Sequence, residues 1–481
     1  MPDSDEEFEV ATSTPRSART GILIGARALT GVIGIAVGAA VIAAATFLPL
    51  PTLGAAAPSI AVTPVPAAQQ LVCPGSVMRL GDENGANATA TSAIGTPTAT
   101  RAATSGTLET RTLASTDAGG GEGAPTLVTA EAAASTSIAG AQSQSVTTPD
   151  YRGFAAAECA RPSSDSWLVG GSTATGRTTL LTIANPGAAL STVTIEIFGE
   201  DGLIDAPGTN GIVVAPGSQR VLSLAGFAPS LESLSVHVTS RGGPVVANLQ
   251  QSIVRGIDAG GVEIIGATTS PALTNVVPGV LIHDAAAVEG ALGDEGYGDL
   301  GTVVRVLVPG SEAASATIRV IPSAVGATGA SFDLSLPAGV VTDVPIDELA
   351  DGSYTVVVEA TVPVVAAVRA STITDGISDL AWFASAEALT DSAFVAVATG
   401  PSATLQFGNP GTESATVLVD DVTLEVPAGS TVSLAIDDNN SYMVTGADGL
   451  FASVSFAAPG KLGSYLLGAS ATREAPVVVY P

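Results

Sequence analysis

Residues 180–198 read Leu-Leu-Thr-Ile-Ala-Asn-Pro-Gly-Ala-Ala-Leu-Ser-Thr-Val-Thr-Ile-Glu-Ile-Phe, two apolar segments on either side of an Asn-Pro-Gly turn. A Pro-Gly turn follows at residues 216–217. Similar pairs of turns occur at residues 308–310 (Val-Pro-Gly) with 337–339 (Pro-Ala-Gly), and at residues 409–411 (Asn-Pro-Gly) with 427–429 (Pro-Ala-Gly). Because self-similarity of this kind marks a repeated structural unit, the sequence predicts three copies of one β-rich domain.

Short alternating segments separated by turn residues fill the chain after residue 165. Residues 192–197 and 234–239 alternate in polarity, which is typical of a strand with one buried face. About seven such segments lie between residues 178 and 268, and this density favours an antiparallel sandwich. We therefore predict a mainly β fold, in which tandem Ig-like antiparallel β-sandwiches cover residues 166–275, 276–385 and 386–481. The Asn-Pro-Gly turns are predicted to close hairpins.

The charge balance excludes one class of partner. The chain of 481 residues carries 17 Lys and Arg against 45 Asp and Glu, a formal net charge of -28. Such a surface repels DNA and RNA, so we expect no nucleic acid partner. Aromatic residues make up only 4% of the chain, so the cores are expected to consist of Val, Ile, Leu and Ala.

An apolar segment near the N-terminus predicts a membrane anchor. Residues 28–48, from Ala28 to Leu48, contain no charged side chain, and about 20 apolar residues span a bilayer as a helix. Three arginines between residues 16 and 27 precede this segment, and the next basic residue is Arg79. By the positive-inside rule, residues 1–27 form a cytoplasmic tail, residues 28–48 a single transmembrane helix in the plasma membrane, and the bulk of the chain is extracytoplasmic. The alternative is a signal peptide cleaved near residues 55–57.

Residues 49–165 are predicted to form a linker with an early strand and a low-complexity insertion. From residue 81 to 150 the composition shifts to Ala, Thr, Ser and Gly, and such a stretch buries too little surface to offset its chain entropy. Two cysteines flank it, Cys73 and Cys159. Outside a membrane an even pair favours one disulfide, with two unpaired thiols as the alternative.

Motifs for catalysis or metal binding are missing from the sequence. It contains no Gly-x-Ser-x-Gly elbow, no His-Glu-x-x-His and no Walker A motif. His237 is expected on the solvent face of a strand, and His283 with Asp284 lacks a nucleophile elbow. Two acidic loops, one with Asp294, Glu295 and Asp299 and one over residues 437–440, offer oxygen ligands for calcium, but solvated loop tips are the preferred interpretation. We predict no enzyme, no cofactor and no metal site.

Several short motifs resemble an uncharacterised family of actinobacterial secreted or membrane-anchored proteins, a domain-of-unknown-function family. They are Cys73-Pro74-Gly75, Cys159 with the Asp-Ser-Trp-Leu-Val-Gly-Gly stretch at residues 165–171, and the Asn-Pro-Gly turn before Val193. The resemblance implies a cell-envelope location and no established activity. The hypothesis is a non-catalytic envelope protein whose sandwiches bind another envelope protein or a glycan. The alternative is an envelope glycan hydrolase with carboxylates in an inter-domain cleft. Any binding site is expected where the copies differ.

Overall fold

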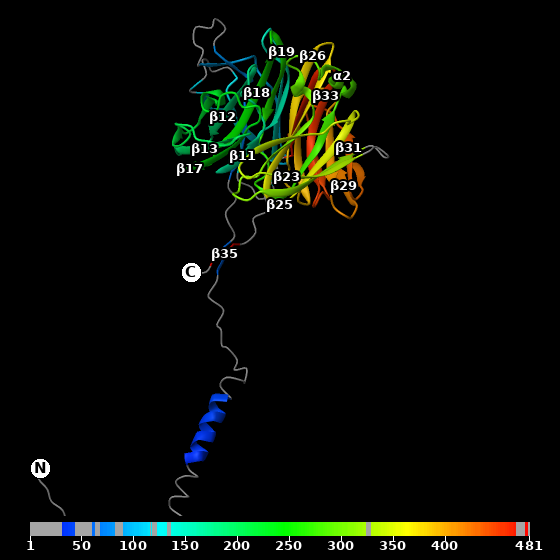
Figure 1. Cartoon of the computed structure of the whole chain (residues 1–481). Helices are drawn as coiled ribbons and strands as arrows, with labels where there is room; N and C mark the ends of the chain where they lie inside the picture. The colour runs from blue at the N-terminus through cyan, green and yellow to red at the C-terminus, as the bar shows by residue number, and fades with distance from the viewer. Residues whose placement is uncertain are drawn as a thin grey trace, which may run out of the picture. The chain divides into compact units, whose positions relative to one another are not determined.

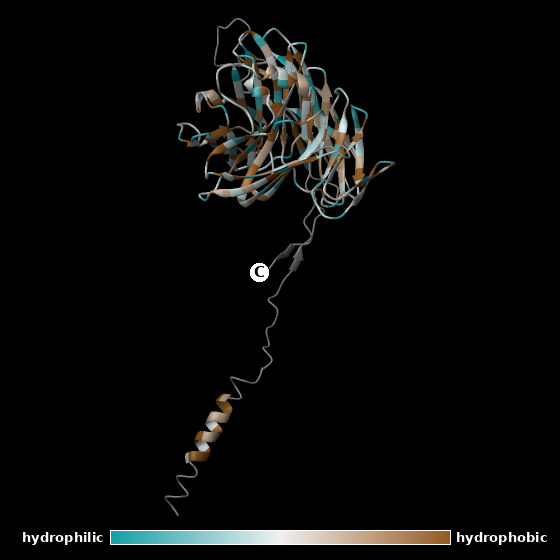
Figure 2. Cartoon of the chain, turned by 45° about the vertical axis from the view of Figure 1, so that its right-hand side comes forward, coloured by the Kyte–Doolittle hydropathy of each residue, from teal (hydrophilic) through white to brown (hydrophobic). Residues whose placement is uncertain are grey.

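The computed structural model describes residues 31–43, 60–62, 68–81, 90–115, 117, 123–131, 136–323, 329–467 and 477–479. The chain divides into two units, residues 1–63 with 476–481 and residues 64–475. The first unit contains a mostly hydrophobic helix over residues 31–43 (Figure 2) and an antiparallel pair of strands, β1 (Ile60–Val62) and β35 (Val477–Val479). Among the described residues, no helix combines the length and apolarity that crossing a membrane requires. Both ends of the expected anchor, Ala28 and Leu48, lie outside the described residues.

The second unit is built mainly from strands (Figure 1) and contains successive segments of similar strand order, each of which we call a repeat. The first repeat consists of β11 (Asp165–Val169), β12 (Arg177–Asn185), β13 (Ser191–Gly199), β14 (Gly202–Ile204), β15 (Ile212–Val214), β16 (Ser218–Ser223), the 3-10 helix η1 (Leu224–Gly226), β17 (Ser235–Arg241), β18 (Val246–Arg255) and β19 (Asp258–Ile265). Its strands form two sheets, ordered β11-β17-β13-β14 and β19-β18-β12-β16. Apolar side chains of both sheets share one core.

The second and third repeats copy this strand order. The second consists of β20 (Ala272–Ile282), α2 (Ala285–Ala291), η2 (Gly298–Leu300), β21 (Val303–Leu307), β22 (Ala314–Pro322), β23 (Ala330–Leu336), β24 (Val341–Pro345), β25 (Gly352–Thr374) and β26 (Ile377–Ala384). The third consists of β27 (Ser392–Val397), β28 (Thr404–Asn409), β29 (Ala415–Val419), β30 (Val422–Val426), β31 (Ser430–Ala435), β32 (Asn440–Thr445), β33 (Phe451–Ala458) and β34 (Lys461–Leu466). The third repeat's sheets run β27-β32-β29-β30 and β31-β28-β33-β34, and in the second repeat the long β25 serves both sheets.

The repeated Asn-Pro-Gly turns link two sheets, so the prediction that they close hairpins is wrong. Strands β12 and β13 belong to different sheets of the first repeat. The Asn185 side-chain amide donates to the carbonyl oxygens of Ala189 (2.8 Å) and Val214 (3.0 Å), and its oxygen accepts from the Gly187 N–H (3.0 Å). Asn409 makes the same three bonds in the third repeat. The side chain thus satisfies backbone groups where the chain leaves one sheet for the other.

The described part of residues 49–165 forms strands in place of the expected linker and flexible insertion. These strands are β2 (Gln69–Cys73), β3 (Met78–Leu80), β4 (Thr91–Ala93), β5 (Thr98–Ala103), β6 (Leu108–Thr112), β7 (Ala114–Ser115), β8 (Thr126–Ala130), β9 (Ile138–Thr147) and β10 (Arg152–Glu158). Two of their sheets run β2-β8-β6 and β10-β9-β5, the order of the third repeat's sheets with one strand fewer in each. We call this the N-terminal repeat. The composition argument failed because alanines in β9 and β10 pack closely enough to be buried.

The last strands of the four repeats, β10, β19, β26 and β34, meet at one centre. Within the described residues, β10 contacts β19, β19 contacts β26, β26 contacts β34, and β34 contacts β10, which closes the circle. Figure 1 shows β19 and β26 side by side. Each of these strands also inserts side chains into the core of a neighbouring repeat. Phe154 of β10 packs in the third repeat's core, Trp382 of β26 in the first and Leu462 of β34 in the second.

Candidate functional site

A fully buried carboxyl, that of Asp379 in β26, lies at the centre of the four strands. Its Oδ2 accepts from the backbone N–H of Phe154 (2.8 Å) and Leu462 (3.2 Å), and its Oδ1 accepts from the N–H of Val262 (3.3 Å). A Cβ added at Gly153 would lie 2.5 Å from Oδ1, so this close approach requires glycine. Burial raises the pKa of Asp379 well above its usual range, and the N–H donors oppose that shift. One side chain thereby connects all four repeats.

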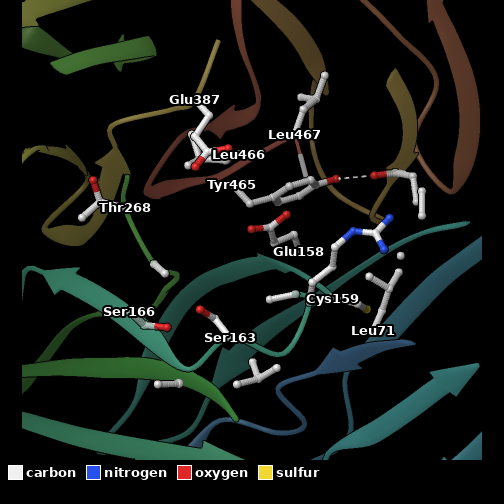
Figure 3. A pocket seen from close by; sticks show the side chains of 18 of the residues that line it. Leu71, Glu158, Cys159, Ser163, Ser166, Thr268, Glu387, Tyr465, Leu466 and Leu467 are labelled. Carbon is white, nitrogen blue, oxygen red and sulfur yellow. Dashed lines mark hydrogen bonds between the residues drawn. The ribbon is translucent and has the colours of Figure 1, made fainter. Parts of the chain in front are cut away.

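Past the ends of these strands lies a cavity of about 290 Å³, which we call the axial pocket. The N-terminal, first and third repeats contribute to its wall, together with the segment that follows the second repeat (Figure 3). Glu158 and Cys159 come from the N-terminal repeat, Trp167 and Thr268 from the first, Glu387 from the segment after β26, and Tyr465 from the third. The pocket is therefore an inter-repeat site with polar and apolar walls, the kind of place where ligand sites commonly occur.

Glu158 is the distinctive group of the axial pocket. The side chain is partly buried, and within the described residues its carboxyl forms no hydrogen bond and no ion pair within 4 Å. Burial raises the pKa of Glu158 to about 7, although the Arg161 guanidinium nearby opposes this shift. A carboxyl in this state exchanges its proton near neutrality, as acid–base groups in enzymes and pH-sensitive binding groups do.

Tyr465 forms a fixed wall of the pocket. Its hydroxyl donates to the Ala396 carbonyl (3.0 Å, the dashed line in Figure 3) and accepts from the Ala398 N–H (3.0 Å). Burial raises the pKa of this phenol, so it stays neutral. Because both hydrogen bonds of the hydroxyl are made with backbone groups of the third repeat, Tyr465 presents its aromatic ring to the cavity.

The predicted disulfide between Cys73 and Cys159 is confirmed, with the two sulfurs 2.01 Å apart. It joins β2 to the residue after β10, and Cys159 lies in the wall of the axial pocket beside Glu158. A Cβ at Gly140 would lie 2.9 Å from the Cys159 sulfur, so the neighbouring strand is packed tightly against the bridge. The disulfide therefore stabilises the part of the N-terminal repeat that carries Glu158.

The acidic loops bind other protein groups instead of converging on a cation position. Asp299 pairs with Arg177 (2.8 Å) and Arg255 (2.7 Å). Burial opposes ionisation of Asp299, but the two guanidiniums outweigh it and hold its pKa below the usual value. In the second loop, Asp438 accepts from the Gly400 N–H (2.9 Å). The described part of the chain contains no group of three or more His, Cys, Asp or Glu arranged to hold a metal ion.

The two histidines occupy structural positions. The His237 ring nitrogens contact carboxylates of Glu196 (2.8 Å) and Asp165 (3.1 Å), and the ring stacks on Trp167 with 4.0 Å between centroids. The expected solvent-face position of His237 thus turns out to be a partly buried one, because the indole covers it.

His283 contacts Asp284 (3.1 Å), as a Ser-His-Asp set would require. The Asp284 carboxylate, however, accepts from the hydroxyls of Thr372 (2.9 Å) and Thr374. Among the described residues, no hydrogen bond joins a serine to His283, whose Nδ1 lies 3.4 Å from the Thr372 hydroxyl, so these groups do not form the triad that the sequence left open.

Several important residues could not be recognised in the sequence. Arg305 is fully buried and forms a bidentate pair with Asp343 (2.7 and 2.8 Å), and it also donates to the Gly171 carbonyl (2.6 Å) of the first repeat. Its guanidinium lies over the Trp382 ring. The partners are far apart in the sequence, and no local pattern connects them. The same is true of Glu158, whose only local signal is its position next to Cys159.

Comparisons with known proteins give a family without an assigned activity. The model of a family of unknown function, DUF5719, matches residues 85–446. No curated protein matches the chain. Among solved structures, Thermotoga maritima 1070 is 16% identical with a TM-score of 0.20, over 24% of this chain and 95% of that one. The BSP domain of a biofilm associated protein is 11% identical with a TM-score of 0.14, over 71% of this chain and 64% of that one.

Proposed function

We propose that this chain, which belongs to the DUF5719 family of unknown function, is a non-catalytic, membrane-anchored protein of an actinobacterial cell envelope. It presents Ig-like β-sandwich repeats outside the cell, where they bind another envelope protein or a glycan. The observation that carries this proposal is the Cys73–Cys159 disulfide. Disulfides persist in oxidising compartments and are rare in the cytosol.

The position of the disulfide agrees with the charge pattern around the apolar segment. Both cysteines follow residues 28–48, and the three arginines precede that segment. If the segment spans the plasma membrane, the positive-inside rule and the disulfide assign the same side of the membrane to the repeats. Two sheets per repeat with a common core support the sandwich interpretation.

Fractionation with thiol labelling in the native host tests this proposal. We expect the full chain in the membrane fraction, and because both cysteines are buried, labelling is done in denaturant, where Cys73 and Cys159 should react with a maleimide only after a reductant is added. Deletion of residues 28–48 should give a cytosolic protein in which both denatured thiols react without reductant. Recovery of the full chain from the cytosol with two reactive thiols would refute the proposal.

A second function, glycan hydrolysis, is favoured by one observation in the axial pocket. Glu158 has a pKa of about 7 and lines the same cavity as Glu387. A general acid with a raised pKa and a second carboxylate are the two groups that glycosidases use. Purified full chain should be incubated with isolated cell-wall glycan, and new reducing ends counted. Activity that falls at least a hundredfold in both Glu158→Gln and Glu387→Gln would establish the hydrolase and displace the non-catalytic proposal.

A further inference from the structure

The charge of the axial pocket is mostly negative. The charged and titratable groups around Glu158 are Asp165, Glu387, Tyr465 and Arg161, and Tyr465 stays neutral. Three carboxyl groups and one guanidinium thus belong to residues that line the cavity, and one of the three, that of Asp165, also contacts His237 Nε2 (3.1 Å). In a chain with a net charge of -28, no long-range field offsets this imbalance. The cavity is electrostatically suited to a cation.

Glu158 is the acid without a hydrogen-bond partner that lines the axial pocket, whereas the fully buried Glu263 also has no partner but does not line this cavity. Asp299 and Asp343 each pair with arginine, and Asp379 accepts backbone N–H groups. Glu158 forms no such contact within the described residues, and its carboxyl is directed into the cavity (Figure 3). A desolvated carboxylate without a partner is unfavourable. A ligand in the cavity that pairs with the Glu158 carboxylate would therefore gain binding free energy.

The walls of the pocket determine what else such a ligand carries. Trp167, Tyr465 and Leu466 provide an aromatic and aliphatic surface beside the carboxyl. A volume of about 290 Å³ excludes a folded partner but admits one side chain or one sugar unit. A divalent metal fits less well, since the described residues offer no group of three acidic or imidazole ligands. An anion would pair with Arg161 and leave Glu158 without a partner.

We propose that the axial pocket binds a primary ammonium group on a short aliphatic or sugar framework, with Glu158 as its counter-ion. The proposal rests on the binding function proposed above and specifies its ligand chemistry. Two sources share this chemistry, the lysine-type side chain of a peptide and an amino sugar. Glu387 and Asp165 contribute long-range attraction at the rim, and Arg161 weakens binding by like-charge repulsion.

Calorimetric titration of the full chain in detergent micelles provides the first test. The probes are Nα-acetyl-lysine methylamide, its uncharged counterpart Nα-acetyl-norleucine methylamide, and the anionic Nα-acetyl-glutamate methylamide. We expect the lysine probe to bind at least tenfold more tightly than either counterpart. Equal binding of the norleucine probe, or tighter binding of the glutamate probe, would overturn the proposal. Methyl glucosaminide, compared with methyl glucoside at pH 7, provides the amino-sugar arm and identifies the source.

Variants assign the binding to Glu158. Glu158→Gln keeps the shape but removes the charge, so affinity for the lysine probe should fall at least tenfold. Glu413→Gln changes an exposed acid of the third repeat and should leave affinity unchanged. Arg161→Gln should strengthen binding at pH 8.5, by roughly fivefold, because it removes a like charge. Unchanged affinity in a folded Glu158→Gln protein, verified by its unfolding temperature, would refute the assignment.

The pH dependence distinguishes a cation from a neutral ligand. Only ionised Glu158 pairs with ammonium, and its pKa of about 7 implies that affinity rises about tenfold between pH 6 and pH 8. The lysine probe stays charged over this range. A neutral hydrogen-bond acceptor would show the opposite slope, since it needs the protonated acid. Failure of this test leaves the membrane fractionation result standing, so the two proposals can fail separately.

Discussion

Replacement of Asp379 should destabilise the whole second unit, because its carboxyl connects all four repeats. Asp379→Ala leaves the N–H groups of Phe154, Val262 and Leu462 without acceptors at a fully buried position. Each buried donor without a partner costs about 1–3 kcal/mol. Removal of the carboxyl also relieves its own desolvation, so the net loss in free energy of unfolding is expected to be about 3–5 kcal/mol. Asp379→Asn keeps one acceptor oxygen and should cost about 1–3 kcal/mol.

Urea titration at neutral pH, followed by tryptophan fluorescence, measures these losses, and Asp421→Ala, which changes an exposed aspartate, is the matched control. The pH dependence adds a second signature. Burial raises the folded pKa of Asp379 above its unfolded value, near 3.8, so the folded state binds more protons and stability falls as pH rises through the interval between the two values. Asp379→Asn should lack this contribution. A loss below 1 kcal/mol in Asp379→Ala would refute the hub role.

Three further predictions concern other buried groups. Replacement of Cys73 and Cys159 by alanine removes a cross-link between residues 86 positions apart in the sequence. In the chain-entropy model this should lower the free energy of unfolding by about 4–5 kcal/mol. Urea titration against the wild type under non-reducing conditions measures the loss. Arg305→Met leaves the partly buried Asp343 without its paired guanidinium and should cost about 2–4 kcal/mol, whereas the additional change Asp343→Leu should restore part of this stability. A double variant that is less stable than the single one would contradict this. The folded pKa of Glu158, about 7, exceeds its usual 4.5. The stability of the wild type should therefore fall by up to about 3 kcal/mol relative to Glu158→Gln as pH rises from about 4.5 to 7. Thermal melts of both proteins across that interval measure this difference, and equal stability throughout would contradict the prediction.

The sequence patterns were informative where a rule acts between near neighbours. Alternation at residues 192–197 and 234–239 corresponds to strands β13 and β17. The turn at Asn185 was recognised as a repeated element, but its role was misassigned because proline and glycine show that the chain turns without showing which sheet it enters. The third repeat makes the same point at Asn409, where the side chain again bonds backbone groups on both sides of the crossing.

The N-terminal repeat was missed for a different reason. A composition rich in Ala, Thr and Ser indicates a low apolar area per residue, which predicts that the segment buries too little surface to offset its chain entropy. Strand β10 shows the alternative, in which small side chains such as Ala155 and Ala156 allow strands to approach closely and larger neighbours such as Phe154 fill the remaining space. Burial of that kind depends on partners from other repeats, which a local composition argument does not contain.

The axial pocket lies where the repeats stop being equivalent. The hydrogen bonds to Asp379 place Phe154, Val262 and Leu462 at matching positions around the centre, so residues at a common offset along β10, β19, β26 and β34 can be compared. Four residues further on from these three positions, and from Leu380 of β26, whose backbone also bonds to the Asp379 carboxyl, the copies have Glu158, Gly266, Ala384 and Leu466. A single charged side chain thus occurs in a ring of otherwise small or apolar ones. Packing between the repeats explains the glycine, alanine and leucine, but it gives no reason for an acid without a partner at this position. A ligand that supplies the missing positive charge gives such a reason.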